Sequence, residues 1–486
     1  MEGRPQMLLV MGLYTSAVLA LGFISRRYQV AASSFLEEYF MGSRSFGGLS
    51  LAMTLVATYV SASSFLGGPG AAYKWGLGWV FLAMIQVPVA FLTLSVLGKR
   101  LNLAFRRMGA ITVNDFLRVR YGSDLVASLG AVFTLVFFVA AISAQLVGGA
   151  RLLEVATGMS YLQSLLVFSA VVVIYTSFGG LRAVVWTDVL QGFVMTAGLF
   201  VLLFAALGAG GGVGQIVSAL GREDPALLSP FGPQGFIAKP FILSFWVLVG
   251  FGVMGLPQTA IRCAIYRDSP SLHRGMVIST LVLGFMMLVV HLLGVFGRVL
   301  VPGIDVGDKV IPTLALKLLS PVLAGVFLAA PVAAIMSTVD SQLILASASA
   351  VKDLYMTYLD HNPSPGRISA ISLATTLGVG VLAALAAVKP PQLLIWINLF
   401  AFGGLQAAFL WPLLLGLYWP RANRYGAMAS MLVGVLSFVY LSHYKISLIA
   451  PRVHAIVPSL LFSLLAFVAV SLITPPPSEE ELKPTR

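Results

Sequence analysis

Two hydroxyl side chains inside a long apolar stretch could supply oxygen atoms to a cation. Within residues 319–348, Ser337 and Thr338 follow Ala334 by three and four positions. Positions with this spacing share one face of a helix, so both hydroxyls can converge with the Ala334 carbonyl. Sodium can be bound in this way by neutral oxygens of the backbone and of side chains. The alternative is that both hydroxyls bond back to carbonyls one turn earlier, as is common in apolar helices.

Two other apolar stretches are interrupted by residues that break helices. Residues 47–68 run into a Gly-Gly-Pro-Gly sequence at 67–70, and residues 240–260 carry three glycines and Pro257. Glycine and proline weaken or end a helix. A matched pair of interrupted apolar segments is the pattern of secondary transporters built from inverted repeats, in which the binding site lies at the breaks.

The composition indicates the class of protein that must position these groups. Apolar residues make up 58% of the 486 positions and charged residues only 10%. An ordinary soluble domain is about a quarter charged. The chain therefore has too little charge to cover a soluble core, and we expect a polytopic helical protein whose surroundings are the lipid bilayer.

We predict an all-α membrane protein with thirteen transmembrane helices. The predicted spans are 8–25, 47–68, 77–98, 125–149, 160–178, 188–209, 240–260, 276–299, 319–348, 368–387, 393–418, 426–443 and 454–473. Spans two to six and seven to eleven form two units of five. Because five is odd, the second unit enters the membrane from the opposite side, which gives an inverted repeat with a broken first helix in each half.

The predicted domain is a single transmembrane unit over residues 1–473. Its first repeat covers about 47–209 and its second about 240–418, and the spans at 8–25, 426–443 and 454–473 are peripheral. The basic connection 99–124 is expected to form amphipathic helix at the membrane surface. We expect the polar tail, 474–486, to be disordered in the cytoplasm.

The positions of the basic residues indicate the orientation. With the N-terminus outside, the inside segments hold most of the 30 Lys and Arg residues, among them Lys99, Arg100, Arg107 and Arg262. The positive-inside rule therefore favours an external N-terminus and a cytoplasmic C-terminus. The net charge of +12 is explained by topology and by attraction to anionic lipid, so nucleic acid is not an expected partner.

Little in the sequence indicates catalysis. The single cysteine, Cys263, cannot form an internal disulfide, and the five histidines lack metal-ligand spacing. We expect His291 to be a hydrogen-bonded core residue rather than a proton relay. The segment from Gly67 to Lys74 lacks the ending of a phosphate-binding loop. An enzyme is therefore not predicted, and no charged or carbonyl-lined filter of a channel is recognisable.

Several stretches resemble a known family. Residues 158–183, which close on YTSFGGLRA, and residues 416–434 resemble the two signatures of the sodium/solute symporter family. Within it, residues 38–45 (EYFMGSRS), 61–74 (SASSFLGGPGAAYK) and 400–404 (FAFGG) are similar to bacterial members that take up pantothenate. The resemblance covers nearly the whole chain.

The resemblance implies how the ion is held. Family members similarly use a carbonyl and two hydroxyls at the positions of Ala334, Ser337 and Thr338. They add two carbonyls from the broken helix, which fall here at Ala57 and Val60. Sodium would then be the transported coupling ion.

A carboxylate near the sodium exit path is also implied by the resemblance, and it falls at Asp188. The alternative for Asp188 is helix capping, because the predicted span begins there. Asp340 lies two residues beyond Thr338, and we interpret it as a packing or gating group rather than a ligand.

The solute is expected beside the ion, between the two breaks. The candidates are polar or amphipathic residues within apolar elements, namely Ser61, Ser63, Ser64, Gln86, Trp246, Gln258 and Asn398. Each is alternatively a hydrogen bond between helices. Half-helix N-termini at a break could meet the carboxylate of pantothenate without a buried basic residue. After Gly255-Leu256-Pro257 the family usually has His, and Gln258 departs from this pattern.

The sequence thus predicts sodium-coupled uptake of pantothenate by alternating access, in the cytoplasmic (inner) membrane of a bacterium. A symporter of the same family for another small monocarboxylate or for proline is the alternative, and a channel or a membrane enzyme is disfavoured. No obligate protein partner is evident from the sequence.

Overall fold

Long helices lying side by side make up the structure. The computed structural model describes residues 4–31, 41, 44–176 and 181–483, and these residues form helices with one isolated bridge, between Phe46 and Tyr266. Parts of the family-like stretches (38–40, 42–43 and 177–180) and the last three residues of the tail lie outside this description. A helix pairs its own backbone groups, which hydrocarbon requires.

The predicted spans coincide with helices. The principal unbroken helices are α1 (Arg4–Ala31), α9 (Asp124–Thr157), α10 (Tyr161–Thr176), α11 (Leu181–Ala209), α15 (Ser269–Leu300), α17 (Pro321–Ala348), α19 (Pro365–Ala386), α20 (Ile395–Tyr418), α21 (Arg424–His443) and α22 (Ile456–Ile473). Among the described residues, nine helices are long and apolar enough to cross a membrane, or ten with one bent pair. A multi-pass membrane protein is confirmed, whereas the count of thirteen is not.

Both predicted interruptions are present. The helix α3 (Gly48–Tyr59) is followed by η2 (Ser63–Gly67) and α4 (Gly68–Trp75), with a bend of 64° at the break. The second interrupted segment comprises α13 (Lys239–Phe245), the π-turn η7 (Trp246–Gly250), the 3-10 segment η8 (Phe251–Gly255) and α14 (Pro257–Arg262). Its backbone is extended at Leu256, directly before Pro257 (φ −87°, ψ 119°).

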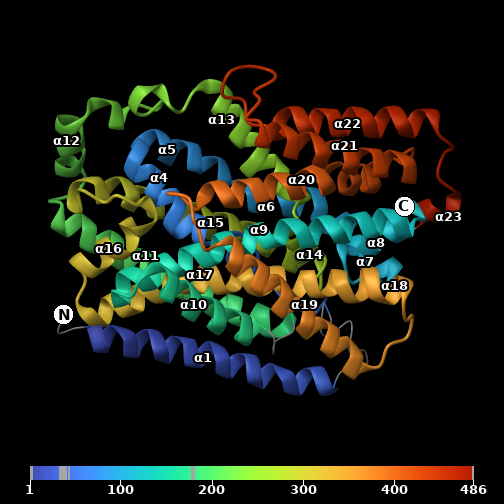
Figure 1. Cartoon of the computed structure of the whole chain (residues 1–486), viewed down its shortest axis with the longest axis horizontal. Helices are drawn as coiled ribbons and strands as arrows, with labels where there is room; N and C mark the ends of the chain where they lie inside the picture. Colours follow the sequence, from blue (N-terminus) through green and yellow to red (C-terminus); the bar gives the residue numbers. More distant parts are fainter. Residues whose placement is uncertain (1–3, 32–40, 42–43, 177–180, 484–486) are drawn as a thin grey trace.

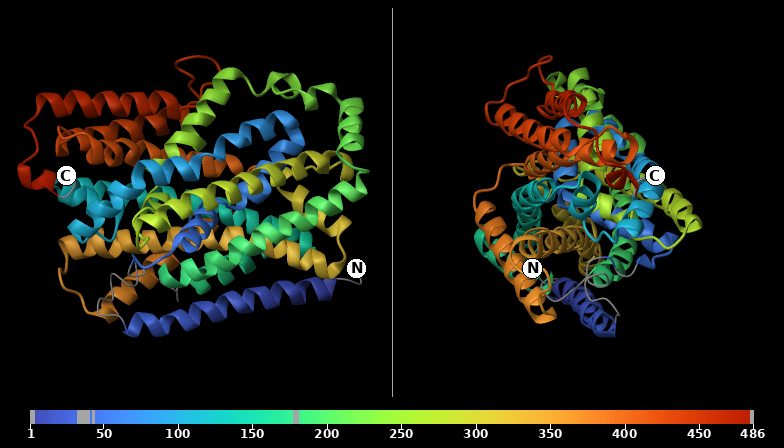
Figure 2. Two further views of the ribbon diagram at one scale, coloured as in Figure 1. Left: turned by 180° about the vertical axis from the view of Figure 1, so that it is seen from behind. Right: turned by 90° about the vertical axis from the view of Figure 1, so that its right-hand side faces the viewer.

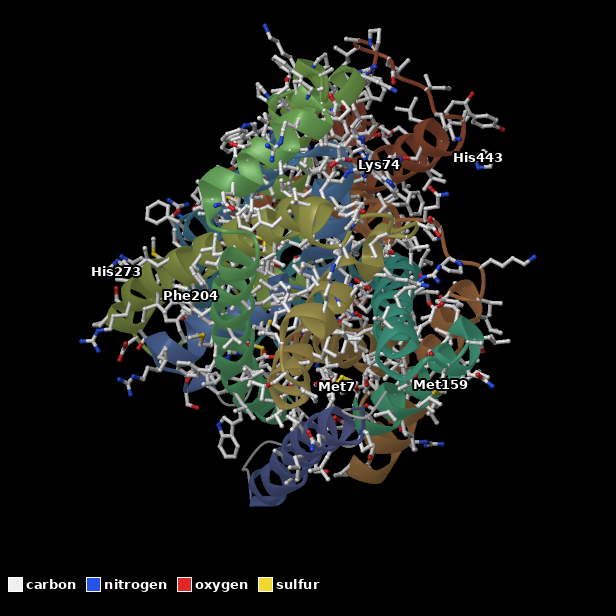
Figure 3. All side chains as sticks on the ribbon, turned by 90° about the vertical axis from the view of Figure 1, so that its left-hand side faces the viewer. Met7, Lys74, Met159, Phe204, His273 and His443 are labelled. Atoms are coloured by element: carbon white, nitrogen blue, oxygen red, sulfur yellow. The ribbon has the colours of Figure 1, made fainter. Side chains whose placement is uncertain are left out.

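The helix α17 forms the centre of the bundle. It packs against α1, α3, α9, α10, α11 and α19, and every residue from 327 to 348 is buried. The outer helices lie at opposite edges, with α1 along one and α21 and α22 along the other (Figures 1 and 2). The rim is apolar: Phe204 of α11 points outward and is 67% exposed (Figure 3). A polar stretch buried at the centre is therefore shielded from lipid by protein.

The segment after the third predicted span continues as helix. The helical pieces α5 (Leu77–Ala83), η3 (Met84–Gln86), α6 (Val89–Thr93) and η4 (Leu94–Gly98) lead into α7 (Lys99–Met108) and α8 (Val113–Tyr121). The predicted amphipathic pattern holds in α7, where Phe105 is buried and Arg107 is exposed.

The C-terminal tail is more ordered than predicted. Residues Glu479–Leu482 form a short helix, α23, which begins with a capping box between Ser478 and Glu481. Leu482 is buried, and Glu481 lies 3.7 Å from Arg424. The capping box and the buried leucine stabilise this helical turn, whereas the polar composition of the tail had predicted disorder.

Two connections between long helices contain short helices. The longer one holds α12 (Val213–Glu223) with the 3-10 turns η5 (Pro225–Leu228) and η6 (Pro233–Gly235), and the other holds η9 (Gly307–Lys309) and α16 (Val310–Leu318). A Cβ on Gly70 would lie 2.5 Å from the carbonyl carbon of Gly307. Glycine is needed there because the backbone of η9 rests directly on α4.

Candidate functional site

The predicted ion-binding oxygens meet where the break of α3 faces α17. Ser337 Oγ donates to the carbonyl of Ala57 at 2.8 Å, and Thr338 Oγ1 donates to that of Val60 at 3.2 Å. The same hydroxyls lie 3.1 and 3.0 Å from the carbonyl of Ala334. Three carbonyls and two hydroxyls are therefore linked by contacts of 2.8 to 3.2 Å, and the bonds expected from back-bonding hydroxyls are among them.

The break explains why two of these carbonyls are available. In a continuous helix the Ser61 amide would bond to Ala57, but here it donates to Ser64 Oγ at 3.4 Å. The Ser64 amide, which would bond to Val60, donates instead to the carbonyl of Ser61 at 3.0 Å. The extended backbone of Val60 (φ −73°, ψ 122°) produces this change. Both carbonyls are left to face α17.

The chemistry of this oxygen set favours a monovalent cation. None of its five oxygens belongs to a carboxylate, so the set carries no formal charge. Within the described residues, no group of three or more His, Cys, Asp or Glu side chains could hold a metal ion. Transition metals and calcium normally require such side chains.

A pocket lies directly beyond the break. Five of the predicted solute residues line it, namely Ser61, Ser63, Ser64, Gln86 and Asn398. Its other walls include the aromatic rings of Trp79, Phe245 and Phe402. The cavity volume is ≈ 40 Å³, little more than the share of one water molecule in the liquid. An organic solute can enter only if the surrounding helices move apart.

A glutamine outside the predicted set connects two walls of this pocket by hydrogen bonds. Gln145 of α9 accepts a hydrogen bond from the Ala62 amide at 2.8 Å and donates to Asn398 at 3.5 Å. On the other side, Tyr59 donates to Gln86 at 2.9 Å. Gln145 lies inside an apolar span, as Gln86 does, so the same signal could have identified it.

Two predicted solute residues lie elsewhere. Trp246 is 46% exposed and Gln258 is buried in α14, and neither lines the pocket. The preceding residue, Phe245, faces the pocket instead. A π-turn begins at Trp246, and its rotation per residue differs from that of an α-helix.

His291 also borders the pocket, as a bonded core residue. Its Nδ1 lies 2.6 Å from the carbonyl of Met287. A Cβ on Gly68 would lie 2.3 Å from its Nε2, so the ring packs against the bare backbone of α4. The predicted core role of His291 agrees with these contacts.

Asp188 is not a helix cap. The helix α11 begins at Leu181, which places Asp188 well inside it. Its carboxylate accepts a hydrogen bond from Thr54 at 2.6 Å and lies 3.8 Å from Nη2 of Arg262. The Arg262 guanidinium also donates to Ser341 at 2.6 Å. Arg262, assigned to an internal connection by the sequence, is in fact fully buried.

These contacts order the site along α3. Asp188 and Arg262 form hydrogen bonds with Thr54 and Thr58, respectively, in α3, the first half of the broken helix. The ion-binding carbonyls of Ala57 and Val60 come next, and the pocket begins with Ser61. Asp340 lies nearby on α17, where it accepts a hydrogen bond from Thr176 of α10 at 2.5 Å. It joins two helices, in agreement with its predicted packing role.

Comparison with known proteins gives consistent results. The model of the Sodium:solute symporter family matches residues 39–434. The sodium/pantothenate symporter of Haemophilus influenzae is 51% identical over 435 residues, covering 89% of this chain and 90% of the relative. That of Escherichia coli K12 is 50% identical over 439 residues, with 90% of each chain covered. The osmoregulated proline transporter OpuE of Bacillus subtilis is 30% identical and covers 98% of this chain and 96% of its own.

Solved structures show the same fold. The outward-open structure of a Na+-coupled sialic acid symporter has a TM-score of 0.79 with 18% identity, and 97% of this chain and 98% of that chain are covered. Mhp1, a nucleobase-cation-symport-1 family transporter, has a TM-score of 0.60 with 16% identity, and 92% and 97% are covered.

Proposed function

Because the chain belongs to the sodium:solute symporter family, we propose that it takes up pantothenate together with sodium by alternating access. The observation that carries the sodium coupling is the meeting of Ala57, Val60, Ala334, Ser337 and Thr338 beside a closed pocket. The substrate assignment is supported by 50–51% identity to two sodium/pantothenate symporters over about nine-tenths of the chain.

The proposed mechanism couples ion and solute through the break in α3. Sodium between the carbonyls of Ala57 and Val60 and the hydroxyls of α17 would hold the two elements together. The same break presents Ser61, Ser63 and Ser64 to the pocket. An ion at the break therefore fixes one wall of the solute site, and its release frees that wall. Sodium binding and solute binding would each strengthen the other.

The pocket offers a solute both polar and apolar contacts. No lysine or arginine is among its described lining residues. The backbone amides where η2 begins already donate to Ser61, so a carboxylate would have to be met by the polar side chains of the pocket. The amides and hydroxyls of Ser63, Gln86 and Asn398 offer partners for hydroxyl and amide groups of a solute. Trp79 and Phe402 offer apolar contact.

The driving force follows from charge. A tenfold sodium gradient supplies about 1.4 kcal/mol per ion. A potential of 100 mV would add about 2.3 kcal/mol for each net charge moved. One sodium with one monoanion moves no net charge, so we expect one-to-one pantothenate transport to be insensitive to voltage. An inward current at saturating pantothenate, with measured one-to-one flux, would contradict this stoichiometric picture.

Uptake into proteoliposomes tests the function. Labelled pantothenate should accumulate under an imposed inward sodium gradient and not under an equal potassium gradient. Excess unlabelled pantothenate should abolish the signal, whereas excess proline should not. Proline is the informative competitor because OpuE, a proline transporter, is 30% identical to this chain. Sodium-driven proline uptake without pantothenate uptake would show that the substrate is proline. Pantothenate uptake without a sodium gradient would refute the coupling to sodium.

We also propose an external N-terminus and a cytoplasmic C-terminus. This orientation rests on the excess of Lys and Arg in the segments that it places inside. Single cysteines at Asp360 and Lys445 test it, because Cys263 is buried and offers little background. An impermeant thiol reagent applied to intact cells should label the cysteine at 445 and leave that at 360 unlabelled. The reverse pattern would invert the topology.

A further inference from the structure

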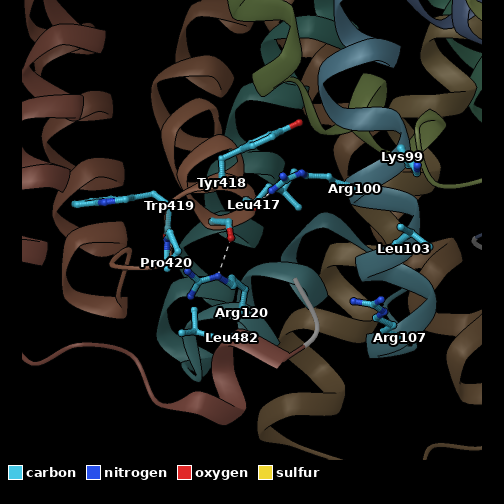
Figure 4. Close-up of a pocket in the computed structure, with 11 residues that line it drawn as sticks. Lys99, Arg100, Leu103, Arg107, Arg120, Leu417, Tyr418, Trp419, Pro420 and Leu482 are labelled. Carbon is cyan, nitrogen blue, oxygen red and sulfur yellow. Dashed lines mark hydrogen bonds between the residues drawn. The ribbon is translucent and has the colours of Figure 1, made fainter. Parts of the chain in front are cut away.

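A basic cavity lies far from the solute pocket, at the other end of α20. It has a volume of ≈ 520 Å³ and is bounded by α7, α8, the end of α20 and α23 (Figure 4). Its cationic walls are Lys99, Arg100, Arg107 and Arg120. No carboxylate of the described residues lines it. In the proposed orientation the cavity opens at the cytoplasmic face.

Two of the four cations are fixed against the end of α20. Arg120 donates from Nε to the carbonyl of Gly416 at 2.7 Å and from Nη2 to that of Trp419 at 3.2 Å. Arg100 donates to the carbonyl of Leu417 at 3.2 Å, and its guanidinium lies 4.4 Å from the centre of the Tyr418 ring. These bonds hold both guanidinium groups in place before any ligand arrives.

The remaining donors have no partner in the described part of the chain. Arg120 is fully buried, yet its Nη1 makes no hydrogen bond there. Lys99 and Arg107 are exposed and form no ion pair with a described residue. Glu481, an acidic side chain whose charge acts on Arg120, is occupied by Arg424 at 3.7 Å and by the Ser478 amide at 2.7 Å.

The positive-inside rule explains basic residues in a cytoplasmic connection. It does not explain why four of them surround one cavity, with a buried donor left over. Like charges brought together repel one another, and an unpaired buried donor is costly. An anion in the cavity would relieve both costs.

We propose that this cavity binds a phosphate-bearing organic anion. Guanidinium forks match the geometry of phosphate oxygens, and Arg100 and Arg120 are positioned for such contacts. The volume exceeds that of inorganic phosphate alone. Tyr418, Trp419 and Leu482 provide apolar contact for an organic portion. Two sources share this chemistry, the headgroup of an anionic phospholipid and a soluble phosphate ester.

Occupancy would bear on α20, and through it on transport. The carbonyls that Arg100 and Arg120 hold are those of the last turn of α20, whose first turn carries Asn398 in the solute pocket. An anion bound by these guanidinium groups, while they keep their bonds to the carbonyls, would tie the end of that helix to α7 and α8. The site itself, however, does not depend on which solute the pocket accepts.

Binding can be measured on the whole purified protein. In nanodiscs of phosphatidylcholine, we would titrate phosphatidylglycerol in one arm and glycerol 3-phosphate in the other, and follow bound ligand by native mass spectrometry. The test variant combines Lys99→Gln with Arg107→Gln, because both side chains are exposed and unpaired and their loss should leave the fold intact. The control combines Arg274→Gln with Arg367→Gln, which removes two exposed cations from the face that the proposed orientation places inside, although Arg367 lies 3.5 Å from Asp360.

We expect one of the two probes to bind the wild-type protein. The Lys99/Arg107 variant should bind it roughly 25-fold more weakly, since each basic residue near an anionic phosphate is worth about a fivefold change in affinity. The control should bind as the wild type does. Retention of phosphatidylglycerol identifies a lipid site, and binding of glycerol 3-phosphate identifies a soluble ligand. Absence of binding by both probes, or equal weakening in the control, would overturn the proposal.

Discussion

The guanidinium of Arg262 lies 3.8 Å from the carboxylate of Asp188, and neither side chain is exposed. The pair joins α14 to α11. Arg262 also reaches Thr58 of α3 at 3.2 Å and Ser341 of α17 at 2.6 Å. Four elements around the ion site are therefore held by one buried charge pair. Such a pair contributes little net stability, but the loss of one partner leaves an uncompensated buried charge.

Removing either member of this pair alone should destabilise the protein. We expect Asp188→Asn or Arg262→Gln to lower the free energy of unfolding by about 3–5 kcal/mol, the usual cost of an orphaned buried charge. The double variant should recover part of this loss, because no charge is then left unpaired. Thermal unfolding of the three purified variants measures the coupling. Strictly additive losses would show that the two groups do not interact.

The sodium site should respond to its hydroxyls. Ser337→Ala or Thr338→Ala removes one of five oxygens, and we expect the sodium concentration for half-maximal uptake to rise about tenfold, corresponding to about 1.4 kcal/mol. Ser347→Ala is the matched control, since Ser347 also carries a buried hydroxyl and lies nearer the C-terminal end of the same helix, α17. Uptake measured as a function of sodium concentration distinguishes the two test variants from the control. Unchanged sodium dependence in both test variants would remove these hydroxyls from the site.

Sequence and structure agree where the signal is local. The breaks near residues 60 and 250 follow from glycine and proline, and the convergence of Ser337 and Thr338 with Ala334 follows from helical spacing. The family resemblance placed Ala57 and Val60, and the structure brings both carbonyls to α17. The family itself is confirmed by the match over residues 39–434.

The disagreements concern contacts between distant parts of the chain. Arg262 is one residue of a short helix next to a connection, and only its packing against Asp188 and Ser341 shows that it is buried. The role of Gln145 depends on its hydrogen bonds to Ala62 and Asn398, which lie on other elements. Trp246 was selected as an amphipathic residue within an apolar element, and only the packed structure shows that Phe245 lines the pocket in its place. Neither composition nor periodicity contains this information.

A buried carboxyl group outside the spanning helices should make stability depend on pH. Asp308 of η9 accepts a hydrogen bond from the Leu394 amide at 3.0 Å. Burial raises its pKa to about 7, against the lowering effects of that bond and of Arg151. The folded protein therefore binds this proton more tightly than the unfolded chain does. The contribution is favourable below about pH 4 and is lost as the pH rises to about 7.

Asp308→Asn tests this dependence. From pH 5 to pH 8 the wild-type protein should lose stability, by at most about 3 kcal/mol, because only the part of the shift between pH 5 and the folded pKa of about 7 falls in this interval. The variant should lose less, because the amide keeps the acceptor for Leu394 without a titrating group. Thermal unfolding at both pH values gives the comparison, and parallel curves for the two proteins would exclude Asp308 as the source.

The solute site should respond to residues that line the pocket and not to Trp246. We expect Asn398→Ala to raise the pantothenate concentration for half-maximal uptake about tenfold, because the variant loses a polar partner in a closed pocket. Gln145→Ala should have a similar effect through the loss of its bonds to Ala62 and Asn398. Trp246→Ala should leave the half-maximal concentration within twofold, as the ring is half exposed and outside the pocket.

The sodium dependence distinguishes this expectation from a general loss of structure. At saturating pantothenate, the Asn398 variant should keep the wild-type half-maximal sodium concentration, because its side chain contributes nothing to the oxygens at the break. The Gln145 variant should shift both values, since the Ala62 amide that Gln145 holds lies two residues after Val60, whose carbonyl faces the ion. Equal effects of the Trp246 and Asn398 substitutions would place the solute outside this pocket.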